Sequence, residues 1–318
     1  MEEDVELALV SDRGAFCGLL VAACTAASAA APRARLVFHI LDGGIPDDDF
    51  SFFQTCLTNC NLNVRVDRIP VTVDAFKGFR PYNGNRMVYA RLLLAKLLPD
   101  VNRVIYFDTD FYWRADVARL WQETEGVDVI AAALDQNEGG VAAERRWFDE
   151  NGIEFPENGY FCAGLCVINL ARWRELGVYD RLIDFLRRHP NPPLCEQTAM
   201  NAVIRSGVCY LPLHWQRSVR KMTPDEFKSP VALHFTAEAP WRASHSTNML
   251  TDAQLLWFKT DAELRGQSLW RSLRRYYSPM EIVRCRVLYI LIMKIPPCRW
   301  AFHLFLAKTG RCFFDERV

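Results

Sequence analysis

The first 70 residues alternate between short apolar runs and segments of helical character, and this alternation restricts the folds open to the chain. The runs Val5 to Val10, Arg35 to Leu41 and Asn63 to Ile69 predict strands, with helices between them at Phe16 to Ala31 and Asp48 to Cys60. A βαβαβ rhythm is typical of a doubly wound sheet that binds nucleotides at the carboxyl ends of its strands. We therefore predict an α/β fold with a Rossmann-like nucleotide-binding sheet.

A later apolar run, Val104 to Phe107, ends in two carboxylates, Asp108 and Asp110. Side chains alternate along a strand, so residues i and i+2 share a face and both carboxylates can reach one cation at the strand's end. Oxygen ligands favour a hard ion such as Mg²⁺ or Mn²⁺, which can hold nucleotide phosphates. The alternative is a solvated turn, because aspartate is common in turns. A helix predicted over Met87 to Leu97 would bring Arg91 into the same neighbourhood.

The composition is that of an ordinary globular protein. Of 318 residues, 50% are hydrophobic, and Lys+Arg and Asp+Glu number 38 each. This length suits one large α/β domain or two domains. With no net charge, the chain as a whole is a poor nucleic-acid binder, although eleven basic residues face three acidic ones from Arg265 to the end.

The N-terminus and the cysteines predict a reducing, cytoplasmic environment. Residues 1–4 are acidic where a secretory signal needs positive charge. The eleven cysteines form no CxxC pair, so we expect reduced thiols. Most are interpreted as small buried hydrophobes, for instance Cys17, Cys24, Cys166 and Cys209.

Several motifs occur in the order and spacing of a known family. They are Phe38–Ile45 (FHILDGGI), Arg86–Leu92 (RMVYARL), Tyr106–Asp110 (YFDTD), Tyr160–Arg174 (YFCAGLCVINLARWR), Glu196–Val203 (EQTAMNAV) and His234–Trp241 (HFTAEAPW). Together they resemble the family-8 retaining glycosyltransferases, and within them most closely the bacterial lipopolysaccharide α-galactosyltransferases. The resemblance covers about residues 5 to 245.

The resemblance implies a GT-A fold and a UDP-hexose donor whose diphosphate is bridged by Mn²⁺, or by Mg²⁺, to Asp108, Asp110 and His234. A predicted strand at Val231–Leu233 could deliver His234, and imidazole is a suitable Mn²⁺ ligand beside carboxylates. Of the other histidines, His39 is interpreted as a core residue. The residues that would hold nucleotide and metal are Ser11, Asp12, Arg91, Asp108, Thr109, Asp110, Ala163 and Gly164.

The catalytic residues implied by the resemblance are Asp135, Glu196 and Gln197. Asp135 follows a predicted strand, Val127 to Leu134, and with Glu196 would hold donor-sugar hydroxyls. Gln197 would lie beneath the anomeric carbon. Glutamine is a poor nucleophile, so its carbonyl oxygen fits an oxocarbenium ion better than covalent chemistry, but double displacement and front-face attack both stay open.

The chain departs from the family pattern at three places. After the first strand Asp12 is present, but the family's Asn and Tyr are absent. Cys162 stands where the family has asparagine before Ala-Gly. The segment from His234 to Trp241 is one residue shorter and lacks the lysine that contacts the diphosphate, so we consider Arg242 or Arg217 as a substitute cation.

The last part of the chain is predicted to be a separate extension. We divide the chain into a catalytic domain, residues 1–262, and a basic, aromatic, α-helical extension, residues 263–318. Its apolar runs, Val287 to Ile295 and Trp300 to Leu306, are too short to span a bilayer. They favour an interfacial anchor on anionic lipid, and the alternative is a helix hairpin packed on the domain.

The family resemblance and the C-terminal extension together predict a Mn²⁺-dependent retaining hexosyltransferase at the inner face of the cell membrane. It would move galactose or glucose from a UDP-sugar to a glycan of lipopolysaccharide or lipooligosaccharide type. Two other functions stay open. One is a degenerate, non-catalytic nucleotide-sugar or glycan-binding protein, and the other is a soluble, glycogenin-like transferase that acts on a protein or glucan.

Overall fold

A computed structural model of the chain describes residues 4–222, 226–229, 231–236, 239–242 and 250–295. Its centre is a seven-stranded sheet of order β3-β2-β1-β4-β7-β6-β8. Within this sheet β7 runs antiparallel to β4 and β6, and the other neighbouring strands are parallel. The strands are β1 (Val5–Ser11), β2 (Leu36–Asp42), β3 (Val64–Pro70), β4 (Arg103–Phe107), β6 (Ile130–Leu134), β7 (Phe161–Asn169) and β8 (Val208–Tyr210).

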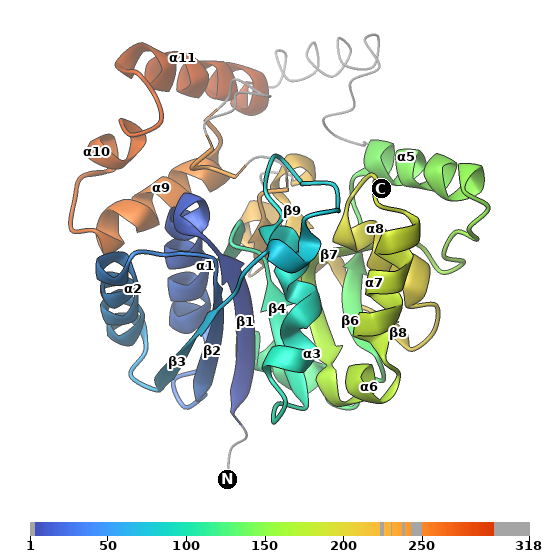
Figure 1. The fold of residues 1–318 in the computed structure, drawn as a ribbon. Coiled ribbons are helices and arrows are strands. Elements are labelled where there is room, and N and C mark those ends of the chain that lie inside the picture. The colour runs from blue at the N-terminus through green and yellow to red at the C-terminus, as the bar shows by residue number, and fades with distance from the viewer. Residues whose placement is uncertain (1–3, 223–225, 230, 237–238, 243–249, 296–318) are drawn as a thin grey trace.

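Helices cover both faces of this sheet (Figure 1). Leu7 and Leu9 of β1 pack in the core beneath α1, α2 and α4, whereas Ala8 packs in the core beneath α3, α6, α7 and α8. Both faces are buried, which explains why these strands read as continuous apolar runs. The helices are α1 (Phe16–Ala29), α2 (Asp47–Cys60), α3 (Leu94–Leu97), α4 (Val117–Glu123), α5 (Glu138–Glu150), α6 (Leu170–Glu175), α7 (Val178–Arg188) and α8 (Glu196–Val203).

The predicted α/β fold is confirmed. The helix predicted over residues 87–97 has these bounds, but it is a 3₁₀ segment at Met87–Leu93 followed by the single α-helical turn of α3. Within this segment Nε of Arg91 donates to the carbonyl of Val88 at 3.1 Å. Cys209, predicted to be buried, is exposed because it lies on β8, the edge strand of the sheet.

A second, small sheet lies next to the carboxyl edge of the first. It has the order β5-β10-β9, with bounds Phe111–Trp113, Ala232–His234 and Arg217–Ser218. β5 follows β4 after a short turn and pairs antiparallel with β10, so that His234 lies opposite Phe111. This pairing confirms the strand predicted before His234, and it joins a segment near residue 110 to one near residue 234.

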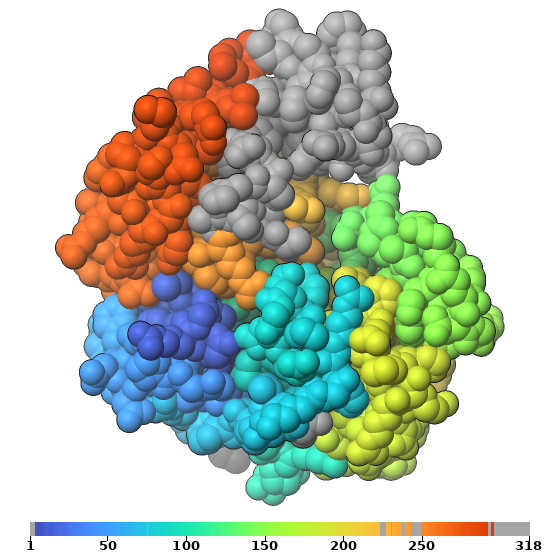
Figure 2. All heavy atoms as spheres, turned by 45° about the horizontal axis from the view of Figure 1, so that its top comes forward, coloured from blue at the N-terminus to red at the C-terminus, as the bar shows by residue number. Residues whose placement is uncertain are grey.

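Among the described residues, three helices follow the main fold: α9 (Asp252–Leu264), α10 (Leu269–Leu273) and α11 (Pro279–Tyr289), with a π-helical turn at Ile290–Lys294. Leu273, Ile282 and Cys285 are buried in one core with Trp257 of α9 and Val21 of α1. Figure 2 shows these helices in orange beside α1 and α2 in blue. Among the described residues no helix is long and apolar enough to cross a bilayer. The run Trp300 to Leu306 lies outside the described residues.

Candidate active site

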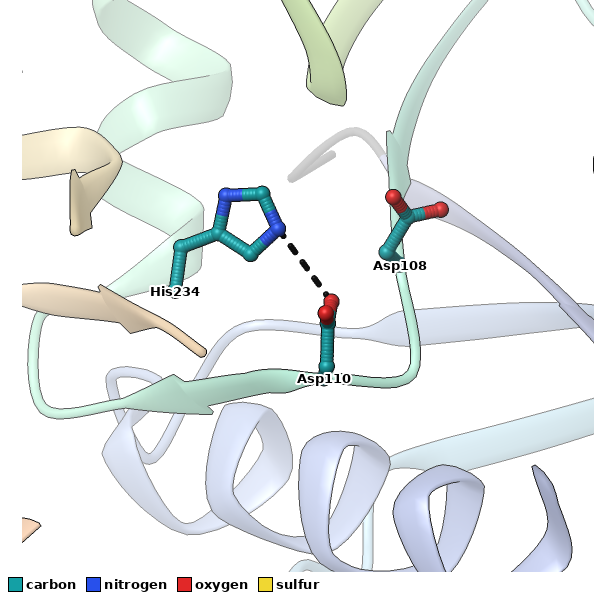
Figure 3. A group of neighbouring side chains, drawn as sticks. All are labelled: Asp108, Asp110 and His234. Carbon is teal, nitrogen blue, oxygen red and sulfur yellow. Dashed lines mark ion pairs between the residues drawn. The ribbon is translucent and has the colours of Figure 1, made fainter. Parts of the chain in front are cut away.

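Two aspartates and a histidine meet where β4 turns into β5 (Figure 3). The amide of Asp108 donates to the carbonyl of Gly164 on β7 at 2.8 Å, which fixes the end of β4. The Nε2 atom of His234 lies 3.2 Å from Oδ1 of Asp110. One ligand atom from each of Asp108, Asp110 and His234 lies within 4.8 Å of the others. The three residues thus form a compact O,O,N set.

The surroundings of this set fit a metal ion. Oδ1 of Asp110 is buried and, apart from its ion pair with Nε2 of His234, has no hydrogen-bond partner within the described part of the chain. A Cβ added to Gly164 would lie 2.5 Å from the imidazole of His234, so glycine is what leaves room for the ring. Carboxylate and imidazole ligands in this arrangement suit Mn²⁺ or Mg²⁺.

The two carboxylates have different surroundings. Burial raises the pKa of Asp108, and Arg91 only partly offsets this effect. Burial acts in the same direction on Asp110, but the adjacent imidazole and the positive charge of Arg242 together outweigh it, so the pKa of Asp110 is lowered. For His234, burial acts to lower the pKa, but Asp110 raises it well above the ordinary value. Positive charge is therefore favoured between the carboxylates, and a divalent cation would supply it.

Arg91 supports this cluster from behind. Its guanidinium donates from Nη2 to Oδ1 of Asp108 at 2.6 Å and from Nη1 to the carbonyl of Ala163 at 2.7 Å. Tyr106 donates to the same Asp108 oxygen at 2.6 Å. These bonds orient Asp108 and direct its second oxygen away from them. The described contacts of Arg91 are thus with protein groups, although the side chain also lines the cavity.

Glu196 and Gln197 open α8 on the other wall of the cavity. Burial raises the pKa of Glu196 to about 7, although Arg91, 3.4 Å away, opposes this shift. Oε1 of Gln197 accepts the amide of Ala163, and its Nε2 donates to Oδ2 of Asp135, both at 2.9 Å. Gln197 and Asp135 are therefore linked and oriented. Cys195, the residue before Glu196, has φ 53°. This is a strained backbone conformation of the kind that is common at functional sites.

One cavity contains nearly the whole predicted set. It is lined by Ser11, Asp12, Arg91, Asp108, Thr109, Asp110, Asp135, Gly164, Glu196, Gln197 and His234. Ala163 does not line it, but its backbone holds both Arg91 and Gln197. Of the two proposed substitute cations, Arg242 lines the cavity, whereas Arg217 donates instead to Gln136 and to the carbonyl of Lys221.

Sequence reasoning missed two residues at the end of the cavity near Asp12. Asn85 donates from Nδ2 to Oδ2 of Asp12 at 2.6 Å, and Tyr82 lines the same wall. The amides of Tyr82 and Asn85 each donate to the other's carbonyl around a turn at Asn83 and Gly84, which both have positive φ. An Asn-Gly pair is a strong signal for such a tight turn. The chain thus has a tyrosine and an asparagine at this wall, supplied by another segment.

The central sheet has a GT-A-like arrangement, and the carboxylate–histidine cluster lies at the end of its strand β4. The chain belongs to glycosyl transferase family 8, whose family model matches residues 7–245. In fold it is similar to the crystal structure of the galactosyltransferase LgtC in complex with donor and acceptor sugar analogs. The TM-score is 0.68 at 22% identity, and the match covers 85% of this chain and 100% of that chain.

Curated relatives match smaller parts of the chain. General stress protein A of Bacillus subtilis (strain 168) is 22% identical over 65% of this chain and 76% of its own length. Probable galacturonosyltransferase-like 3 of Arabidopsis thaliana is 36% identical over 31% of this chain and 30% of its own length. Lipopolysaccharide 1,3-galactosyltransferase of Salmonella typhimurium is 21% identical over 54% of this chain and 49% of its own length. The chain thus spans about half or less of these two transferases.

Proposed function

We propose that the chain is a retaining hexosyltransferase that moves galactose or glucose from a UDP-sugar to a glycan of lipopolysaccharide type. The observation that carries this proposal is that the Asp108–Asp110–His234 set and the linked Gln197–Asp135 pair line one cavity. Sugar transfer needs charge compensation at a leaving diphosphate and polar groups around the sugar. This cavity offers both, side by side.

Each end of the cavity has its own task in this proposal. Asp12, Tyr82 and Asn85 would face the nucleoside, while Asp135 and Gln197 would face the sugar. Mn²⁺ held by the two aspartates and the histidine would act as a Lewis acid toward the diphosphate. Arg242 would add fixed positive charge at the same end as the metal ligands, where the family lysine is absent.

The role of Gln197 follows from its hydrogen bonds. Because Oε1 already accepts from Ala163, we propose that the amide as a whole is held against Asp135 and faces the sugar as an oriented dipole. A dipole fixed before the reaction stabilises developing charge without reorganising. This role is compatible with front-face attack and needs no covalent intermediate.

A donor panel tests the proposal. UDP-galactose, UDP-glucose, UDP-N-acetylglucosamine and UDP-galacturonate would be incubated with Mn²⁺ and a lactoside acceptor, and UDP release measured. The control is the Asp110→Ala variant. Release from UDP-galactose or UDP-glucose supports the proposal, and release only from UDP-galacturonate would correct the donor. UDP binding without turnover of any donor would favour the non-catalytic binding protein.

We also propose that the C-terminal helices bind an anionic membrane surface, which would bring the enzyme to a glycolipid acceptor. Exposed apolar side chains recur at helical spacing along α11 and the following turn: Met280, Val283, Val287, Ile290 and Leu291. The same region carries Arg271, Arg274, Arg275, Arg284 and Lys294. An apolar stripe with basic residues around it is typical of a helix that lies in a lipid interface.

A further inference from the structure

A buried glutamine outside every sequence motif touches the predicted metal ligand His234. Gln216 is 1% exposed and precedes β9. Its Nε2 atom lies 3.3 Å from Nδ1 of His234, the ring nitrogen that does not face Asp110. Its Oε1 atom is buried and accepts no hydrogen bond from the described residues. A buried acceptor in this condition costs free energy, so it calls for an explanation.

The protonation of the imidazole supplies one. An amide NH₂ can only donate, so the present arrangement suits a neutral His234 with its proton on Nε2. Coordination of a metal through Nε2 requires the lone pair there and places the proton on Nδ1. In this state the NH₂ of Gln216 would oppose a second donor.

A half-turn of the amide removes this conflict. It replaces NH₂ by Oε1 with almost no change in shape, because amide nitrogen and oxygen are nearly equal in size. The rest of Gln216 is held in place: its backbone amide donates to the carbonyl of Leu213 at 3.0 Å, and its carbonyl accepts from Gln136 at 2.5 Å. Only the terminal amide needs to move, and Oε1 then gains a donor.

We propose that Gln216 is a positioning residue, which accepts the Nδ1 proton of His234 and so holds the imidazole with Nε2 directed at the metal. The inference rests on the metal site of the proposed function. Metal-bound histidines in general donate their other ring nitrogen to an oxygen acceptor, and loss of that acceptor weakens metal binding 10- to 100-fold. Gln216 would be this acceptor.

Three variants test the inference by calorimetric titration of Mn²⁺ in the presence of UDP. Gln216→Leu removes the acceptor and should weaken Mn²⁺ binding by about 10- to 100-fold. Gln216→Glu keeps an acceptor and should bind Mn²⁺ at least as tightly as the unmodified protein. Gln254→Leu, at a buried glutamine of α9 that lines no described cavity, is the matched control and should leave Mn²⁺ affinity unchanged.

Nitrogen-15 NMR of the histidine ring with Mg²⁺ and UDP gives a readout that packing alone would not change. The unmodified protein and Gln216→Glu should show a slowly exchanging proton on Nδ1 of His234, and Gln216→Leu should lose it. The inference about Gln216, but not the proposed metal site, would be overturned by either of two results. One is that Gln216→Leu binds Mn²⁺ as tightly as the unmodified protein, and the other is that Gln216→Leu and Gln216→Glu lose the same affinity. If the unmodified protein binds no Mn²⁺, the proposed metal site fails as well.

Discussion

The imidazole of His234 stacks on the ring of Phe111, with ring centroids 4.5 Å apart and planes 23° from parallel. The two residues are cross-strand partners in β10 and β5, and the amide of Phe235 donates to the carbonyl of Asp110. The residue directly after Asp110 therefore fixes the plane of the His234 imidazole. This pairing couples two proposed metal ligands that are distant in sequence into one rigid unit.

Removing Asp110 should strongly weaken metal-dependent nucleotide binding. We expect Asp110→Ala to lower UDP affinity in Mn²⁺ by roughly two orders of magnitude, because an O,O,N set reduced to two ligands binds a hard ion poorly. Calorimetry with and without Mn²⁺ measures this loss. The control is Asp180→Ala, an exposed surface aspartate. Unchanged metal-dependent affinity in Asp110→Ala would show that the ion binds elsewhere.

Replacing Gln197 should impair turnover more than nucleotide binding. Gln197→Ala loses hydrogen bonds to Asp135 and Ala163, so we expect unfolding to become easier by about 1 to 3 kcal/mol. Turnover should fall by roughly one to three powers of ten, while UDP affinity stays nearly constant. Steady-state kinetics and UDP titration separate the two effects. A parallel loss of UDP affinity would place this side chain at the nucleotide instead.

Glu196 should make the metal-free protein less stable as pH rises. Its folded-state pKa is raised to about 7 from an ordinary value of 4.5, so the folded protein favours the protonated carboxyl. The stability from this group is present below about pH 4.5 and is lost as pH rises through about 7. This loss amounts to about 3 kcal/mol of unfolding free energy, and we expect the Glu196→Gln variant not to show it. Urea unfolding at pH 5 and pH 8 measures it, and identical pH slopes would contradict the assignment.

Vesicle binding should depend on the stripe of α11. Deleting residues 266–318 would also remove Leu273, Ile282 and Cys285 from a packed core, so point variants are the sharper test. Val283→Ser with Val287→Ser, at side chains 60% and 48% exposed, should lower co-sedimentation with anionic vesicles on the order of tenfold without affecting folding.

The matched control for this experiment is Leu62→Ser. Leu62 is 87% exposed and lies between α2 and β3, far along the chain from the basic helices. High salt should weaken binding of the unmodified protein, because basic residues contribute about 1 kcal/mol each near an anionic surface. If the double variant sediments like the unmodified protein, α11 is not the lipid-binding face.

The main elements of the fold were accessible from the sequence because their signals are local. The buried parallel strands β1, β2 and β3 read as apolar runs, and the helices between them follow in order. The proposed metal ligands were accessible for a related reason, since Asp108 and Asp110 end an apolar strand and His234 follows another. Each of these positions is marked by its immediate neighbours in the chain.

The remaining features depend on contacts between distant segments. Gln216 belongs to no motif and matters only because β9 and β10 place it against His234. The three-residue strand β5 is too short to show periodicity. Burial of Leu273 and Ile282 could not be separated from membrane contact, because apolar residues serve both purposes. Cys209 was predicted to be buried because it lies in an apolar run. That its strand lies at the edge of the sheet depends on pairing with other strands, which the local sequence does not show.

Gly164 links the backbone of the sheet to the chemistry of the site. Its carbonyl accepts from Asp108, and its missing side chain is the space that the imidazole of His234 occupies. A methyl group at position 164 would displace the imidazole of His234. A related chain without this histidine could have alanine at position 164. Across related sequences, positions 164 and 234 are therefore expected to change together. Where the histidine of β10 is lost, a larger residue is expected at the glycine position of β7.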